Sequence, residues 1–179
     1  MNMKIISIAA VTAGGKTTIV NELKKRLPNS QSLHFDNYAF EGEVDNFYQW
    51  VLDGADYLVW NLKPLEEDIL KIRGTGACEY LILDYPFAYC HDTIRSYIDT
   101  AFFIDTPLDI SLARRILRDM NDATADDIRR DLEMYLKYAR IVYIQMQKDI
   151  LPSSDYVIDG VLSVDEISNE IISKIDYKK

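Results

Sequence analysis

A glycine-rich segment near the amino terminus has the residue types and spacing of a phosphate-binding loop. Residues 10–17 read AVTAGGKT and match the pattern G-x-x-x-x-G-K-[ST], except that Ala10 replaces the first glycine. An apolar run precedes the segment and a helical pattern follows it. Glycine lets successive backbone N–H groups approach a phosphate closely, and the start of a helix adds a favourable dipole. The segment therefore predicts a cradle for the phosphates of a nucleotide.

The residues of this segment divide between backbone contacts and two functional side chains. Backbone contacts are expected from the turn and the first helical residues, namely Ala13, Gly14, Gly15, Lys16, Thr17 and Thr18. In such a loop the Lys16 ammonium group reaches the β- and γ-phosphates, and the Thr17 hydroxyl binds Mg²⁺. Ala10 is expected to end the preceding strand, where no positive φ is needed, so its methyl group is a mild departure. We therefore expect ATP and Mg²⁺ as cofactors, with Lys16 also serving catalysis.

Two aspartates come directly after apolar runs, Asp36 in LHFDNYAF and Asp84 in YLILDYPFAY. Open parallel sheets bind ligands beyond the carboxyl ends of their strands. At that edge Asp36 could accept the proton of an attacking hydroxyl or hold Mg²⁺, and Asp84 stands where a metal-supporting carboxylate is usual. The alternatives are that Asp36 is a turn residue and that Asp84 only terminates its strand.

Three arginines gather in the segment DTPLDISLARRILRDM, near the end of a predicted helix. Arg114 and Arg118 share one helix face because they are four residues apart. Beside a mobile segment, such side chains could neutralise charge on a migrating phosphoryl group when the segment closes. We expect Arg114 and Arg118 to act in catalysis and Arg115 to bind the nucleotide. The alternative is an ordinary solvated helix face.

The chain as a whole alternates short apolar runs with amphipathic helical segments, which is typical of a parallel sheet covered on both faces. Its 179 residues fit one domain. We expect this single domain over 1–179, with a cap over the acceptor at about 37–73 and a short lid at about 119–130. The predicted strands are 4–10, 32–35, 80–84, 101–105 and 156–158.

Two helices beyond the fourth predicted strand have recognisable ends. Thr106 and Pro107 predict a helix N-terminus, with Thr106 as the N-cap and Pro107 in the first helical position, and this helix should reach about Asp119. After Thr124, apolar residues keep a helical period until Pro152. This period predicts one helix of about 25 residues.

Composition and charge exclude several classes of partner. A formal net charge of -9 and a pI near 4.7 oppose nucleic-acid binding, which depends on many Lys and Arg contacts to phosphates. No window is long and apolar enough for a membrane helix, and we expect a cytoplasmic protein without a membrane partner. Cys78 and Cys90 are expected to be free thiols. His34 and His91 are too few for a zinc site. The sequence is compatible with a homo-oligomer.

Two other classes of P-loop protein fit poorly. A GTPase would carry an N-K-x-D guanine motif and a D-x-x-G switch, and neither stands at a suitable place. A ring ATPase would normally be longer and place an arginine at a subunit interface. The pattern therefore favours a kinase.

The order of motifs after the fourth predicted strand resembles one family. These motifs are D-T-P-x-D-I-x-L-x-R-R-I-x-R-D, then a lid, a long helix with Y-x-x-x-A-R, and PSSDYVIDG. The chain is similar in this order to the uridine kinase and phosphoribulokinase-like branch of the P-loop kinases. The resemblance implies a three-layer α/β P-loop NTPase fold with a five-stranded parallel sheet of order 2-3-1-4-5. It also implies that Asp36 is the general base, that Asp84 is the acidic residue after the third strand, and that Arg114, Arg115 and Arg118 lie at the lid base.

Two segments depart from that family and bear on the acceptor. The lid is shortened to MNDATADD before Arg129, and the interval between the second and third strands differs from the usual substrate segment. This interval holds seven aromatic residues, which are Tyr38, Phe40, Phe47, Tyr48, Trp50, Tyr57 and Trp60. They could sandwich a planar base or sugar, with Asp53, Asp56 and Asn61 binding hydroxyls, or they could fill the core. Weaker candidates for acceptor contacts are Arg73, Arg95, His91 and Tyr89.

The motifs together predict an ATP- and Mg²⁺-dependent kinase that transfers the γ-phosphoryl group to a hydroxyl of a nucleoside or similar small metabolite. The alternative is an ATP-binding regulatory protein or slow ATPase, whose acceptor pocket would be filled by its own aromatic side chains.

Overall fold

The computed structural model describes residues 3–177, and five parallel strands form its single sheet. The sheet order is β2-β3-β1-β4-β5, as predicted. Strand β2 ends before Phe35, one residue earlier than predicted, because Phe35 begins a 3₁₀ turn. The strands are β1 (Lys4–Ala10), β2 (Ser30–His34), β3 (Tyr80–Asp84), β4 (Thr100–Asp105) and β5 (Tyr156–Asp159).

Helices connect the strands and form the outer layers. The α-helices are α1 (Lys16–Arg26), α2 (Phe47–Leu52), α3 (Lys63–Thr75), α4 (Asp92–Arg95), α5 (Leu108–Asp119), α6 (Ala125–Met134), α7 (Arg140–Ile150) and α8 (Val164–Tyr177). The shorter helical pieces are the 3₁₀ turns η1 (Phe35–Asn37) and η2 (Tyr57–Val59) and the π-helical segment η3 (Tyr135–Ala139). Within residues 3–177, none of these helices combines the length and the apolar character that crossing a bilayer requires.

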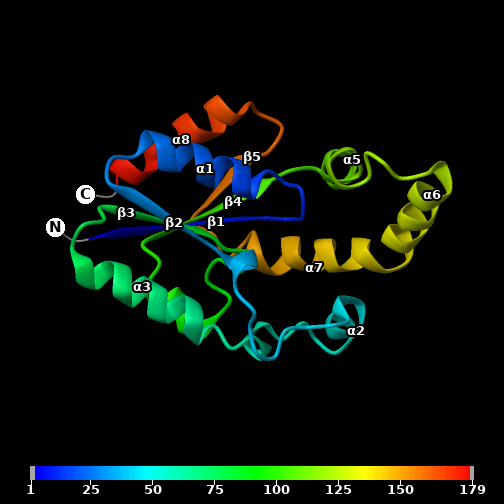
Figure 1. The fold of residues 1–179 in the computed structure, drawn as a ribbon, viewed down its shortest axis with the longest axis horizontal. Coiled ribbons are helices and arrows are strands. Elements are labelled where there is room, and N and C mark those ends of the chain that lie inside the picture. Colours follow the sequence, from blue (N-terminus) through cyan, green and yellow to red (C-terminus); the bar gives the residue numbers. More distant parts are fainter. Residues whose placement is uncertain (1–2, 178–179) are drawn as a thin grey trace.

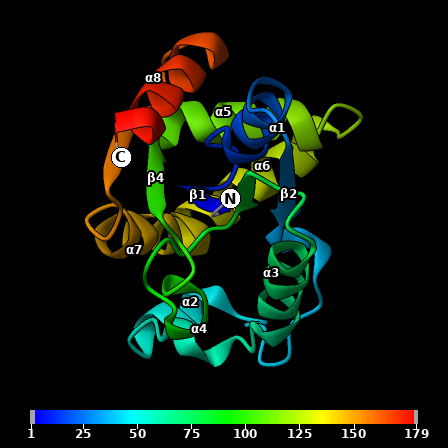
Figure 2. The same cartoon turned by 90° about the vertical axis from the view of Figure 1, so that its left-hand side faces the viewer.

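The central strand β1 contributes to two apolar cores. Ile5 and Ala9 pack in the cluster that includes residues of α3 and α7, whereas Ile6 and Ile8 pack in the cluster that includes α1 and α8. This alternation follows from the period of two in a β-strand. Figures 1 and 2 show the same arrangement, with α1 and α8 over one face of the sheet and α3 and α7 over the other.

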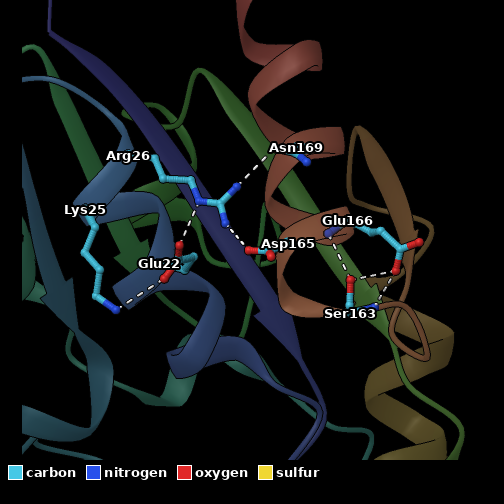
Figure 3. Close-up of polar contacts among 7 residues, drawn as sticks. All are labelled: Glu22, Lys25, Arg26, Ser163, Asp165, Glu166 and Asn169. Carbon is cyan, nitrogen blue, oxygen red and sulfur yellow. Dashed lines mark hydrogen bonds and ion pairs between the residues drawn. The ribbon is translucent and has the colours of Figure 1, made fainter.

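The outer helices α1 and α8 are joined by polar side chains as well as by the core. The Arg26 guanidinium donates to Glu22 on its own helix at 2.8 Å and to Asn169 on α8 at 3.0 Å, and it pairs with Asp165. Figure 3 shows these contacts between the two helices. Ser163 and Glu166 form a reciprocal cap at the start of α8, because each side chain bonds the backbone N–H of the other. These polar contacts hold α1 and α8 together over the face of the sheet opposite α3.

The carboxyl ends of the parallel strands meet at one edge of the sheet. Figure 1 shows that α2 projects beyond this edge on one side, and that α5 and α6 project beyond it on the other. These helices carry the predicted acceptor cap and lid. Ligands of open α/β sheets bind at this edge, so the fold places the candidate residues where a site is expected.

Two predicted helix features differ from the structure. Helix α5 begins at Leu108 with Pro107 at the N-cap, one residue later than predicted, because the Thr106 side chain is used in another contact. The predicted helix after Thr124 is divided by η3 into α6 and α7. A π segment commonly produces a kink. Figure 1 shows the corresponding change of direction between α7 and α6.

Candidate active site

The phosphate-binding loop joins the end of β1 to the start of α1. Its turn takes positive φ at Ala13 (57°) and at Gly15 (100°), and Gly15 caps α1 without a side-chain hydrogen bond. A Cβ at Gly14 would lie 2.9 Å from both the Ala10 Cβ and the Val11 oxygen, so Gly14 is required for lack of space. Ala10 ends β1 and is not among the residues with positive φ, as predicted. The start of α1 has no side-chain cap, and its first residues line a cavity.

A buried threonine anchors this loop to the neighbouring strands. The Thr106 hydroxyl, directly after β4, lies 2.9 Å from the Gly14 oxygen and 3.4 Å from the Gly160 oxygen. The Gly14 N–H donates to the Val11 oxygen at 2.9 Å. The hydroxyl has one proton to donate, and the shorter contact is to the loop. Thr106 therefore holds the loop instead of capping α5.

Asp84 lies at the end of β3, and three side chains contact its carboxylate. Its carboxylate pairs with Lys16 and accepts a hydrogen bond from the Thr17 hydroxyl at 2.7 Å, and the His34 Nδ1 lies 2.9 Å away. Asp84 is 2% exposed. Burial raises the pKa of its carboxyl group, but the Lys16 charge and the hydrogen bonds from Lys16, Thr17 and His34 outweigh burial and lower the pKa below 3.8.

The sequence motifs do not indicate His34 as a residue of this site. His34 is the last residue of β2, and the parallel register places it directly beside Asp84 at the end of β3. The only sequence signal is that both residues end predicted neighbouring strands. That signal becomes specific only when the strand order is known.

One cavity of about 620 Å³ unites the loop with the other predicted residues. Lys16 and Thr17 line it together with Asp36 from η1 and with Arg114 and Arg118 from α5. Asp36 is exposed, and the charge of Arg118 interacts with it. Asp84 supports the same cavity through its contacts with Lys16 and Thr17. The cavity thus brings a phosphate cradle, an exposed carboxylate and two arginines together.

Two curated relatives match almost the whole chain. It is 28% identical over 212 aligned residues to uridine-cytidine kinase B of Dictyostelium discoideum, which covers 98% of this chain and 84% of that protein. It is 34% identical over 206 aligned residues to uridine kinase of Schizosaccharomyces pombe, with 94% of this chain and 44% of that protein covered. Over most of its length the chain is thus similar to uridine kinases and uridine-cytidine kinases. This similarity supports a P-loop phosphotransferase that acts on a small molecule.

Solved structures agree with this kinase fold. A protein described as a possible uridine kinase from Bacillus stearothermophilus has a TM-score of 0.54 and 15% sequence identity, over 89% of this chain and 90% of that one. No protein-family model matches the chain. The alignment with the Dictyostelium protein is longer than the 179 residues of this kinase, so that relative has residues that this chain lacks.

Aromatic side chains form one wall of the kinase cavity and also pack against one another. Trp50 and Trp60 are both buried, and their rings lie edge to face at 5.5 Å. Aromatic side chains from the segment between β2 and β3 therefore belong to the hydrophobic core and also form the cavity wall, and they do not fill the cavity. Tyr38 and Phe40 stack on each other at 5.4 Å and do not line the cavity. The aromatic residues of the wall are Phe35, Phe47, Trp50, Tyr57, Trp60 and Phe87.

Other proposed acceptor contacts have local partners instead. Asp53 accepts a hydrogen bond from Gln49, and Asp56 accepts one from the Leu58 N–H. Asn61 donates to Glu41. None of the three aspartate and asparagine candidates lines the cavity, and their expected acceptor role stays a prediction.

The weaker candidates also lie outside the kinase cavity. Arg73 lies over the Tyr97 ring, and Arg95 pairs with Asp92. Tyr89 donates to Asp155 at 2.6 Å. The buried His91 ring contacts the Trp60 oxygen and accepts from the Thr93 N–H, which stabilises the start of α4.

The three arginines that were predicted at the lid base point to different places. Arg114 lines the cavity, and its Nη1 and Nη2 atoms each lie 3.4 Å from the Gly160 oxygen. Arg118 lines the same cavity and donates to Asp119 at 2.6 Å. Arg115 instead pairs with Asp131 and lines a second cavity of about 670 Å³, between α2, α6, η3 and α7. The prediction that Arg115 binds the nucleotide stays untested.

Proposed function

We propose that this chain is an ATP- and Mg²⁺-dependent cytoplasmic kinase that phosphorylates a hydroxyl of a nucleoside or similar small metabolite. The observation that carries the proposal is the single cavity in which the phosphate-binding loop, Asp36, Arg114 and Arg118 face one space. A phosphotransferase needs the donor phosphate, an acceptor base and cationic side chains within one such space.

The donor end fits a nucleotide triphosphate. Gly15 caps α1 without a side-chain hydrogen bond, and φ is positive at Ala13 and Gly15, so backbone N–H groups are available to phosphate oxygens. Lys16 would neutralise the phosphates, and Thr17 with Asp84 would hold Mg²⁺, directly or through water. When bound, Mg²⁺ neutralises charge that develops on the phosphate oxygens.

The transfer step assigns a different task to the remaining charged side chains. Asp36 would take the proton of the acceptor hydroxyl while the hydroxyl oxygen forms its bond to the γ-phosphorus. The bond from the γ-phosphorus to the bridging oxygen breaks, and that oxygen leaves with the nucleoside diphosphate. Arg114 and Arg118 would stabilise the negative charge spread over the phosphoryl oxygens.

A nucleoside-like acceptor is supported by two independent features. The relatives are named uridine and uridine-cytidine kinases, and the aromatic wall offers flat surfaces on which a planar base could stack. The altered lid and acceptor interval argue against carrying over uridine as the specific substrate.

The test is a panel of nucleosides, sugars and vitamins with ATP and Mg²⁺, read out as nucleoside diphosphate formation and as mass of the phosphorylated product. We expect at least one nucleoside-like compound to accelerate ATP consumption. With that compound, Asp36→Asn should lower kcat by about 10²- to 10⁴-fold while ATP binding is retained. The exposed Asp92→Asn is the matched control and should leave kcat unchanged. Wild-type kcat in Asp36→Asn would exclude Asp36 as the base.

A further inference from the structure

The His34 side chain lies between the metal-supporting carboxylate and a serine of its own strand. Its Nδ1 is 2.9 Å from the Asp84 Oδ2, and its Nε2 is 3.1 Å from the Ser32 Oγ. His34 and Ser32 share one face of β2 because they are two residues apart. The Asp84 side chain is 3% exposed and that of His34 is 23% exposed. The contact is thus mostly screened from solvent.

The chemistry of the partners defines which ring nitrogen carries a proton. The Asp84 carboxylate pairs with the Lys16 ammonium group and accepts a hydrogen bond from Thr17, and the oxygens of an ionised carboxylate can only accept hydrogen bonds. The contact with Asp84 therefore requires a proton on the His34 Nδ1. In the neutral ring Nε2 is then an acceptor, and the Ser32 hydroxyl can donate to it. Ser32 and Asp84 thus favour the same tautomer.

Lys16 and Thr17, the other two partners of Asp84, are expected to contact the bound nucleotide and its metal. Lys16 pairs with Asp84 in this structure, but in the proposed function its ammonium group contacts the phosphates. The Thr17 oxygen would face the metal. A buried carboxylate that loses its cation without a compensating donor is strongly disfavoured. Of the three side chains that contact Asp84 here, only His34 has no expected contact with the nucleotide or the metal.

We propose that His34 is a positioning residue that holds the Asp84 carboxylate, through the Nδ1–H bond, in the orientation that supports Mg²⁺ beside Thr17 while Lys16 engages the phosphates. The inference rests on the proposed use of ATP with Mg²⁺. Groups that orient a metal-supporting ligand commonly change metal affinity by about 10- to 100-fold. His34 is suited to this task because β2 is paired with β3 along its length, and the register fixes the two strand ends side by side.

The second histidine of the chain provides a structural contrast. His91 is also buried and hydrogen-bonded, but its partners are the Trp60 oxygen and the Thr93 N–H, both in the backbone. Its ring nitrogens are occupied by these two backbone groups, and the ring does not line the cavity. His91 thus stabilises local structure, whereas His34 contacts the carboxylate at the candidate metal site.

The experiment measures the binding of a non-hydrolysable ATP analogue by calorimetry, with Mg²⁺ and with chelator. The readout is the ratio of the two dissociation constants, which reports the gain in affinity from the metal. We expect His34→Leu to lower this gain by about tenfold or more and to leave metal-free affinity within about threefold of wild type. Ser32→Ala, which keeps the Nδ1 contact, should stay within about threefold of the wild-type gain.

Two amide variants, His34→Asn and His34→Gln, test the same contact if His34→Leu fails to fold. In His34→Asn the amide N–H₂ occupies the place of Nδ1, whereas in His34→Gln it lies nearer the place of Nε2. We expect His34→Asn to retain most of the gain from Mg²⁺ and His34→Gln to lose it. An equal gain in both folded variants, or a wild-type gain in folded His34→Leu, would overturn the proposal. If the wild-type protein itself binds no nucleotide, the proposed function fails instead.

Discussion

Arg114 and Arg115 are consecutive residues of α5 whose guanidinium groups serve two different cavities. Arg114 faces the phosphate-binding loop and contacts the Gly160 oxygen, whereas Arg115 pairs with Asp131 of α6. Successive residues of an α-helix point about 100° apart, so the two side chains leave α5 in different directions. One arginine of the pair thus lines the candidate reaction site, and the other contacts α6.

This division predicts separable effects of the two arginines. Arg114→Ala should lower kcat with the identified acceptor by about 10²-fold, because one charge-stabilising donor is lost. Arg115→Ala should lower the free energy of unfolding by about 1–3 kcal/mol, because Asp131 loses its partner, and should change kcat much less. Steady-state kinetics and urea unfolding of both variants give the comparison. Equal losses of kcat would place Arg115 in the nucleotide site after all.

Lys16 tests the phosphate cradle directly. Lys16→Ala should weaken ATP binding and lower kcat by at least about 10²-fold, since no other side chain of the loop carries a positive charge. Lys24→Ala removes an exposed lysine from the same helix and is the matched control. Calorimetry measures affinity and a coupled assay measures kcat. Full affinity and turnover in Lys16→Ala would rule out the cradle.

Gly160 tests the close approach of the β5 end to β4. A Cβ added at Gly160 would lie 2.0 Å from the Thr106 Oγ1 and 2.8 Å from the Thr106 N. Gly160→Ala should therefore lower the free energy of unfolding by about 1–3 kcal/mol. In Gly74→Ala the new Cβ meets nothing within 4 Å, and that variant should gain about 0.5–1 kcal/mol by helix propensity. Tryptophan fluorescence in urea measures both changes, and equal stability of the two variants would contradict the packing.

The pH dependence of stability tests the Asp84 network. Because the pKa of Asp84 is lower in the folded state than its usual 3.8, folding favours the ionised form. This contribution is fully present above the unfolded pKa and is lost as the pH falls through the folded pKa. The free energy of unfolding should thus decline more steeply below pH ~5 in the wild type than in Asp84→Asn. Urea unfolding between pH ~3 and ~7 gives the two slopes, and parallel slopes would argue against the network.

The elements that the sequence predicts well are those whose signal is local. The strands ending at Ala10 and Asp84 have the predicted bounds because continuous apolar runs end at polar or glycine-rich segments. The prediction that Thr106 caps α5 was wrong. Its hydroxyl bonds the Gly14 oxygen instead, and this contact depends on where the phosphate-binding loop lies. Local capping rules contain no information about that neighbour.

Most of the candidate site was predicted, but its pairings were not. Lys16, Thr17 and Asp36 were found because a loop motif and strand ends place them at one edge of the sheet. The contact between His34 and Asp84 depends on strand order and register, which join residues 50 positions apart. The direction of Arg115 depends on the rotation of α5 about its own axis. Both features are tertiary, so a motif along the chain cannot reveal them.

The π segment η3 makes the direction of α6 depend on the length of one helical turn. A π turn contains one more residue than an α-helical turn, and the extra residue widens that turn. Loss of one codon within residues 135–139 would restore a continuous α-helix and remove the kink, while the faces of α6 and α7 would stay nearly in register. The approach of Asp131 to Arg115 depends on that kink, because the kink sets the direction of α6. A single codon thus sets the angle between two helices.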